Sequence, residues 1–183
     1  EEGRRVGELR YVYASGEVHS KGDCIDTGGL VGKNSTLIEH AGAYCYVDSE
    51  GNYAGGLIGE NDGATINFAK ADDNSVKGKY YVAGLIAINR KAMILNSSSN
   101  DIVRGSKVAG FVAENTLESS IVSCRSDGDV YGKGSYNTSG FVAINAGIIS
   151  SSFATGSVEN LNFPEPEEGE KITDKGVAGF VAF

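Results

Sequence analysis

The chain has 183 residues, which is long enough for one domain that buries a core without disulfide bridges or metals. Its formal charge is −8 with basic and acidic residues interspersed, which argues against nucleic acid as a partner, because nucleic-acid binding depends on clustered Lys and Arg. No apolar run approaches the roughly 20 residues that cross a bilayer, and the chain opens with neither Met nor a signal-peptide pattern, so we expect an excised segment with no membrane partner.

The composition favours short strands joined by tight corners. The chain contains 26 Gly, two Pro and no Trp, together with many Ser, Asn, Val and Ile. Its three cysteines, Cys24, Cys45 and Cys124, show no CxxC spacing and cannot all pair with one another. We therefore expect small buried or half-buried thiols, with no metal site, no disulfide scaffold and no cofactor.

A short apolar motif, Gly-(Leu/Phe)-(Val/Ile)-(Gly/Ala), occurs six times. Its copies begin at Gly29, Gly56, Gly84, Gly110, Gly140 and Gly179, with spacings of 27, 28, 26, 30 and 39 residues. Each repeat also carries a second apolar segment that opens with Ile or Leu and closes on or near Val. Two or three short strands in a repeat of this length make one coil of a solenoid, in which equivalent positions stack at about 4.8 Å. The sequence predicts an all-β, right-handed parallel β-helix of about six coils, forming a single domain over residues 1–183.

The first apolar segment, residues 9–18, begins a row of aromatic side chains. Positions two and four after the opening residue have outward parity in a strand. In the first three coils these positions include Tyr11, Tyr13, His40, Phe68 and Lys70. Rings beside polar groups on a rigid sheet favour the binding of a sugar chain, so we predict these five as ligand-binding residues. The alternative is an aromatic ladder that only packs neighbouring coils against one another.

The anchor motif and the residues after it predict a buried face. The residue after each anchor Gly is Leu or Phe, which needs burial, and alternation places the Asn five positions after the Gly on the same side. The series comprises Asn34, Asn61, Asn89, Asn115 and Asn145. Stacked amides can satisfy one another when held in register. We predict that these five form a structural ladder inside the solenoid.

By the same alternation, the opposite face of the anchor strand points outward. It carries an apolar stripe of Val31, Ile58, Ile86, Val112 and Val142. Soluble monomers rarely expose a stripe of this length. We therefore predict an interface with a second copy of the chain, a homodimer, or with a neighbouring domain. The alternative is that the face is wrongly assigned and the core is wider.

Further on, the 39-residue spacing between the last two anchors leaves room for an acidic loop over residues 159–175, which contains both Pro residues.

Clustered carboxylates in stacked positions would indicate an enzyme, and none is evident. The acidic residues are dispersed over different coils, and His19 and His40 have no evident nucleophile partner. We expect no catalytic activity. Residues 48–52 and 127–129 place oxygen ligands on Gly-containing turns, which suits calcium, but the spacing pattern is incomplete and such clusters are more often solvated corners.

The stretches Gly-Gly-Leu-Val-Gly-Lys-Asn (28–34) and Gly-Gly-Leu-Ile-Gly-Glu-Asn (55–61) resemble the GLUG repeat, and the later copies look like its Ala-Gly-Phe-Val-Ala variants. This resemblance implies a β-helix from a bacterial secreted or cell-surface protein, and therefore an extracellular location. We expect a non-catalytic carbohydrate-binding module for a polysaccharide such as xylan or another plant glycan, attached to a secreted glycan-degrading protein. The alternative is an adhesin or a protease-appended spacer that binds protein partners.

Overall fold

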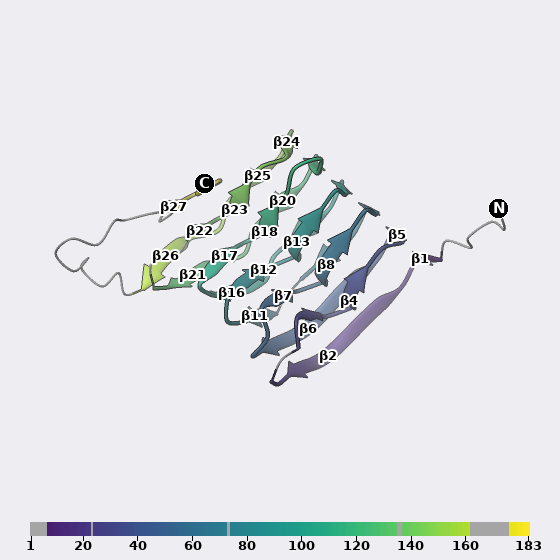
Figure 1. The fold of residues 1–183 in the computed structure, drawn as a ribbon, viewed down its shortest axis with the longest axis horizontal. Coiled ribbons are helices and arrows are strands. Elements are labelled where there is room, and N and C mark those ends of the chain that lie inside the picture. Colours follow the sequence, from purple (N-terminus) through teal and green to yellow (C-terminus); the bar gives the residue numbers. More distant parts are fainter. Residues whose placement is uncertain (1–6, 23, 73, 135–136, 162–175) are drawn as a thin grey trace.

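The computed structural model describes residues 7–22, 24–72, 74–134, 137–161 and 176–183. Within them every regular element is a strand, and the strands form four parallel sheets that wind as a β-solenoid (Figure 1). None of these residues forms a helix that could span a membrane. The predicted acidic insertion lies largely outside this part of the chain, because residues 162–175 are not described.

Each turn of the solenoid passes through the four sheets in the order A, B, C, D. Sheet A comprises β1 (Glu8–Arg10), β5 (Leu37–Glu39), β9 (Thr65–Asn67), β14 (Met93–Leu95), β19 (Ser120–Val122) and β24 (Ile148–Ser150). Sheet B comprises β2 (Tyr13–Ser20), β6 (Gly42–Ser49), β10 (Lys70–Ala71), β11 (Ser75–Lys77), β15 (Ser98–Ser99), β16 (Ile102–Gly105), β20 (Arg125–Ser126), β21 (Val130–Lys133), β25 (Phe153–Ala154) and β26 (Val158–Leu161).

The other two sheets hold the anchor motif. Sheet C comprises β3 (Asp26–Gly28), β7 (Tyr53–Gly55), β12 (Tyr81–Ala83), β17 (Lys107–Ala109), β22 (Thr138–Ser139) and β27 (Val177–Ala178). Sheet D comprises β4 (Val31–Asn34), β8 (Ile58–Asp62), β13 (Ile86–Arg90), β18 (Val112–Asn115) and β23 (Val142–Asn145). The six strands of sheet A are separated by five complete turns, so the solenoid has about five turns rather than the predicted six.

The core is a set of aligned rows, one from each sheet. Sheet A contributes an Ile row that includes Ile38, Ile66 and Ile94, and sheet B contributes a Val row that includes Val47, Val76 and Val103. The register pairs each residue with its equivalent in the next coil, as Ile38 pairs with Ile66 and Val76 with Val103. Because identical side chains stack on one another, the core has the same cross-section in successive coils. Each further coil buries more apolar surface in the same arrangement.

The predicted interface stripe is wrong. Ile58, Ile86, Val112 and Val142 are completely buried in the core, and Val31 packs against it from the first coil. The reason lies in the backbone: Gly29 and Leu30 form a bend between sheets C and D, and the strand starts only at Val31. Alternation therefore does not run across the bend, and both apolar residues of each anchor point inward. The wider core explains the stripe, and the argument for a homodimer or a covering domain falls with it.

The predicted Asn ladder is a continuous chain of hydrogen bonds. The Nδ2 of Asn34 donates to the Oδ1 of Asn61 at 2.9 Å, and the pattern continues through Asn89 and Asn115 to Asn145 at 3.1, 2.9 and 2.8 Å. Several of these amides use their second hydrogen to hold the following corner, as Asn89 does with the carbonyl of Ala92. The ladder thus satisfies buried amides and fixes the corner between sheets D and A.

We predict that Asn89→Leu lowers the free energy of unfolding by about 1 to 3 kcal/mol, the cost of leaving buried polar groups unpaired. The change breaks the links to both Asn61 and Asn115. Urea unfolding measures the effect. Asn34→Leu, at the end of the ladder, breaks one amide link instead of two and should cost less. An Asn89→Leu midpoint equal to that of the unchanged chain would show that the ladder does not stabilise the fold.

Candidate functional site

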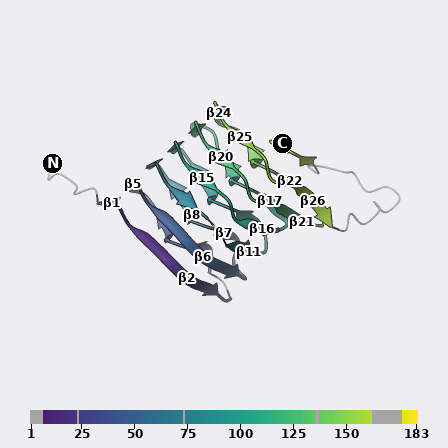
Figure 2. The same cartoon turned by 180° about the vertical axis from the view of Figure 1, so that it is seen from behind.

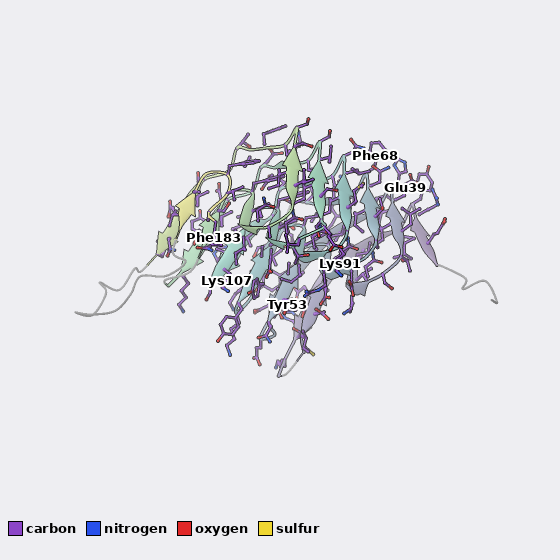
Figure 3. All side chains as sticks on the ribbon, turned by 45° about the horizontal axis from the view of Figure 1, so that its top comes forward. Glu39, Tyr53, Phe68, Lys91, Lys107 and Phe183 are labelled. Atoms are coloured by element: carbon purple, nitrogen blue, oxygen red, sulfur yellow. The ribbon has the colours of Figure 1, made fainter. Side chains whose placement is uncertain are left out.

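The predicted aromatic row lies at the corner between sheets A and B. Tyr11, His40 and Phe68 all adopt a left-handed backbone conformation there, with φ of 55°, 53° and 51°. Their rings stack face to face, with centroids 4.9 Å apart for both Tyr11–His40 and His40–Phe68. Phe68 stands at the outer rim near Glu39 (Figure 3). The corner conformation, which repeats at Asn96, Ser123 and Ser151, is what directs these side chains outward in one row.

The stacking of these rings limits the ring surface that is available to a sugar. Both faces of the His40 ring are covered by its neighbours, so the row presents ring edges outward and not a flat platform. Tyr13 belongs to the next row, where the register aligns it with Gly42 and Lys70. Lys70 lies over the Tyr44 ring at 4.8 Å and pairs with Asp72 at 3.6 Å. The structure therefore brings the five predicted ligand-binding residues together in two adjacent rows, but it uses the inner ring faces for packing between coils.

A groove of about 1300 Å³ runs along the solenoid where sheet B ends. Its first side is the row of outward residues that follows the buried Val row: Asp48, Lys77, Arg104 and Tyr131. The register places these four in successive coils. The arrowheads of β2, β6 and β26, which mark this end of sheet B, lie along the lower edge of Figure 2. The groove therefore follows the axis and crosses several coils.

The second side of the groove comes two residues later in each coil, with Glu50, Lys79, Ser106, Lys133 and Leu161. Between the two sides runs the backbone of Gly78, Gly105 and Gly132. Glycine is needed here, because a Cβ on Gly105 would lie 2.4 Å from the side chain of Val82 in the core. The absence of side chains on the core side of this row lets sheets B and C approach each other.

Two contacts organise the side chains of the groove. Lys77 forms an ion pair with Asp48 at 3.2 Å. The guanidinium of Arg104 lies over the ring of Tyr131 at 4.8 Å, a cation–π contact that holds both groups upright along the wall. Sequence reasoning missed this site because it ended the second segment at its closing Val. The residues one and three positions after each closing Val are the signal that would have found it.

A second polar cluster fills the corner between sheets C and D. A Cβ on Gly59 would lie 2.7 Å from the backbone nitrogen of Thr27, so β3 and β8 touch backbone to backbone. Glu60, 6% exposed, is held there by Lys33 at 3.2 Å and Arg90 at 3.3 Å.

On the side of sheet C, this cluster is lined by tyrosines. Tyr53 and Tyr81 meet edge to face, with centroids 5.4 Å apart, and Lys107 donates to the Tyr81 hydroxyl at 3.0 Å. Tyr53 and Lys107 project from the same face of the molecule in Figure 3. Burial raises the pKa of the Tyr53 hydroxyl, with Tyr81 and Glu60 adding to the shift. The corner is therefore polar but closely packed.

Asp26 belongs to the same polar cluster, and one of its carboxylate oxygens lacks a hydrogen bond within the described part of the chain. Its Oδ1 is buried and has no hydrogen-bond partner among the described residues. Burial raises the pKa of the Asp26 carboxyl, and the nearby Glu60 carboxylate raises it further, while Lys33 and Arg90 oppose the shift. A raised pKa means that the folded chain binds this proton more tightly than the unfolded chain does, so the contribution of Asp26 to stability is full below pH 3.8 and is lost as the pH rises through its folded pKa.

We predict that Asp26→Asn raises the unfolding temperature at pH 7, because the amide removes a charge that burial and Glu60 disfavour. Thermal unfolding of both proteins across a pH series measures the difference. The gain should shrink as the pH falls below the raised pKa and vanish below about pH 3.8, where the Asp26 carboxyl is protonated in both the folded and the unfolded states of the unchanged chain. A gain that is independent of pH, or a loss at pH 7, would contradict this account of the corner.

No protein-family model, curated protein or solved structure matches this chain. The described residues contain no group of three or more His, Cys, Asp or Glu side chains placed to hold a metal ion. The groove crosses several coils and combines charged side chains with an aromatic ring, so its geometry carries the functional argument.

Proposed function

We propose that this chain is a non-catalytic carbohydrate-binding module that holds an extended polysaccharide in the axial groove. The observation that carries the proposal is the groove itself, which is about 1300 Å³ in volume and crosses the coils from Asp48 to Leu161. Sites for small molecules are usually enclosed pockets. An open groove that repeats with the coils suits a chain of repeating units.

The chemistry of the groove walls supports a sugar polymer. Tyr131 offers a ring, and the Lys and Arg side chains offer apolar stems with polar ends. An aromatic contact contributes about 0.5 to 1.5 kcal/mol. A few such contacts give affinities in the micromolar to millimolar range, so a polymer that spans several coils should bind better than a short oligomer.

Two further parts of the proposal concern the handedness of the solenoid and the kind of protein that carries it. We propose a right-handed winding, because crossover connections between parallel strands are right-handed in almost all proteins. We also propose that the anchors are GLUG repeats and that the chain belongs to a bacterial secreted or cell-surface protein that degrades glycans. The closely packed aromatic row of Tyr11, His40 and Phe68 then has a mainly structural role, and Tyr13 and Lys70 flank it.

We predict that soluble polysaccharide in a native gel retards the chain and that Tyr131→Ala weakens the retardation several-fold, because Tyr131 supplies the aromatic ring of the groove lining and holds Arg104 in place. Xylan, β-glucan and pectin are the polymers to compare. Tyr13→Ala is the matched control, since it removes an exposed tyrosine of the same sheet outside the groove. If no polymer retards the chain, the proposal fails and the adhesin or spacer alternative takes its place. If Tyr13→Ala alone abolishes retardation, the binding surface is the predicted aromatic row.

A further inference from the structure

Most cations in the groove have no carboxylate partner among the described residues, whereas most cations on the rest of the described surface have one; Lys21, Lys91 and Lys107 are the exceptions outside the groove. Six Lys and Arg side chains of the described residues have a carboxylate within ion-pair distance: Arg10, Lys33, Lys70, Lys77, Arg90 and Arg125. Only Lys77 among these lines the groove. The other three groove cations, Lys79, Arg104 and Lys133, have no carboxylate of the described chain within that distance.

The groove is therefore a positive strip on a negative protein. The chain carries a formal charge of −8, whereas the groove lining holds four cations against Asp48 and Glu50. Lys77 already neutralises Asp48. Glu50 lies at the end of the groove nearest the N-terminus, where it accepts a hydrogen bond from the backbone nitrogen of Gly22 at 3.2 Å. The unpaired cations stand beyond it.

Their spacing suits a polymer with repeated negative charges. Lys79 and Lys133 stand on the second side of the groove two coils apart, and Arg104 stands on the first side in the coil between them; successive coils repeat at about 4.8 Å. Like charges so close repel one another, and a row of carboxylates would relieve that repulsion. The Arg104 guanidinium, fixed over Tyr131, keeps N–H groups free at its edge, a geometry that accepts a carboxylate on two parallel hydrogen bonds.

We propose that the glycan held in this groove is an acidic polysaccharide, with carboxylates of successive sugar units meeting Lys79, Arg104 and Lys133. This inference rests on the proposed function and narrows it to one class of ligand. Tyr131 contacts the sugar ring, and the three cations recognise its charge. A neutral glycan would contact the ring of Tyr131 but would offer no charge to the three cations.

The experiment compares two ligands that differ only in charge, polygalacturonate and the same polymer with its carboxylates fully methyl-esterified. Binding of each is measured by isothermal titration calorimetry at low and high salt. We expect the acid form to bind about tenfold or more tightly than the ester, and added salt to remove most of that difference, because exposed charge pairs are screened. The triple variant Lys79→Ala, Arg104→Ala and Lys133→Ala should bind the two polymers equally, and no more tightly than the unchanged chain binds the ester, because it loses the charges together with the apolar stems.

The matched control is the triple variant Arg10→Ala, Lys91→Ala and Arg125→Ala, which changes the net charge equally outside the groove and should keep the preference for the acid. Equal binding of acid and ester would overturn the acidic-ligand inference and leave the proposed function standing. Binding of neither polymer, nor of any neutral glycan, would remove both. Poly-glutamate or single-stranded DNA bound as tightly as polygalacturonate would also overturn the inference, since the groove would then recognise charge without the sugar.

Discussion

Ile86→Glu is expected to prevent the chain from folding, or to lower the free energy of unfolding by more than about 4 kcal/mol. Ile86 is completely buried, between Ile58 and Val112 of the neighbouring coils. A carboxylate there would have apolar rows on both sides and no cation to pair with, and this cost is a large part of the 5 to 15 kcal/mol that typically stabilises a domain. Circular dichroism and urea unfolding of the purified variant measure the effect.

The control for this prediction makes the same chemical change on the surface. Ile148 lies in β24 and is 68% exposed, so Ile148→Glu should leave the unfolding midpoint within about 0.5 kcal/mol of the unchanged chain. If Ile86→Glu instead gave a folded protein that only changed its oligomeric state, Ile86 would belong to an outer interface, and the arrangement of sheet D described above would be wrong.

The second large effect concerns the anchor glycine. We predict that Gly84→Ala destabilises the chain by about 3 kcal/mol, at the upper end of the usual cost of overpacking. A Cβ at Gly84 would lie 2.1 Å from the carbonyl oxygen of Gly110 in the next coil and 3.0 Å from the Cβ of Ser99. The obstructing atom is backbone, so it cannot move aside as a side chain can. Urea unfolding again provides the measurement.

Gly179 offers a control within the same motif. It occupies the anchor position of the last coil, and a Cβ there would meet nothing within 4 Å. Gly179→Ala should therefore be nearly neutral. Equal losses from Gly84→Ala and Gly179→Ala would indicate that both glycines are needed for backbone freedom and not for the close approach of successive coils.

The periodic part of the fold could be predicted from the sequence because stacking forces equivalent residues into register. The first five Gly anchors and the Asn series repeat for direct physical reasons: each of these glycines has a carbonyl oxygen from the next coil against it, and each Asn bonds to the next. The register of His40 between Tyr11 and Phe68 could also be predicted, since it follows from counting equivalent positions.

The orientation of the anchor residues could not be predicted by the same counting. Strand alternation applies only within a strand, and the bend at Gly29 and Leu30 resets it, so Val31 turns inward after Leu30. The groove was missed for a related reason. Its wall residues, such as Arg104 and Lys79, differ in type from coil to coil, so they form rows only when each is counted from the closing Val of its coil, as the register does.

The central claim, that the axial groove is the binding surface, is tested most directly by nuclear magnetic resonance on the isotope-labelled chain during titration with a polygalacturonate oligomer. We expect the amide signals of Gly78, Gly105 and Gly132 to shift with those of Arg104 and Tyr131, because these groups line the groove. The signals of Tyr11, Tyr13, His40 and Phe68 should remain in place. Shifts confined to those four residues, or no shifts at saturating ligand, would contradict the account.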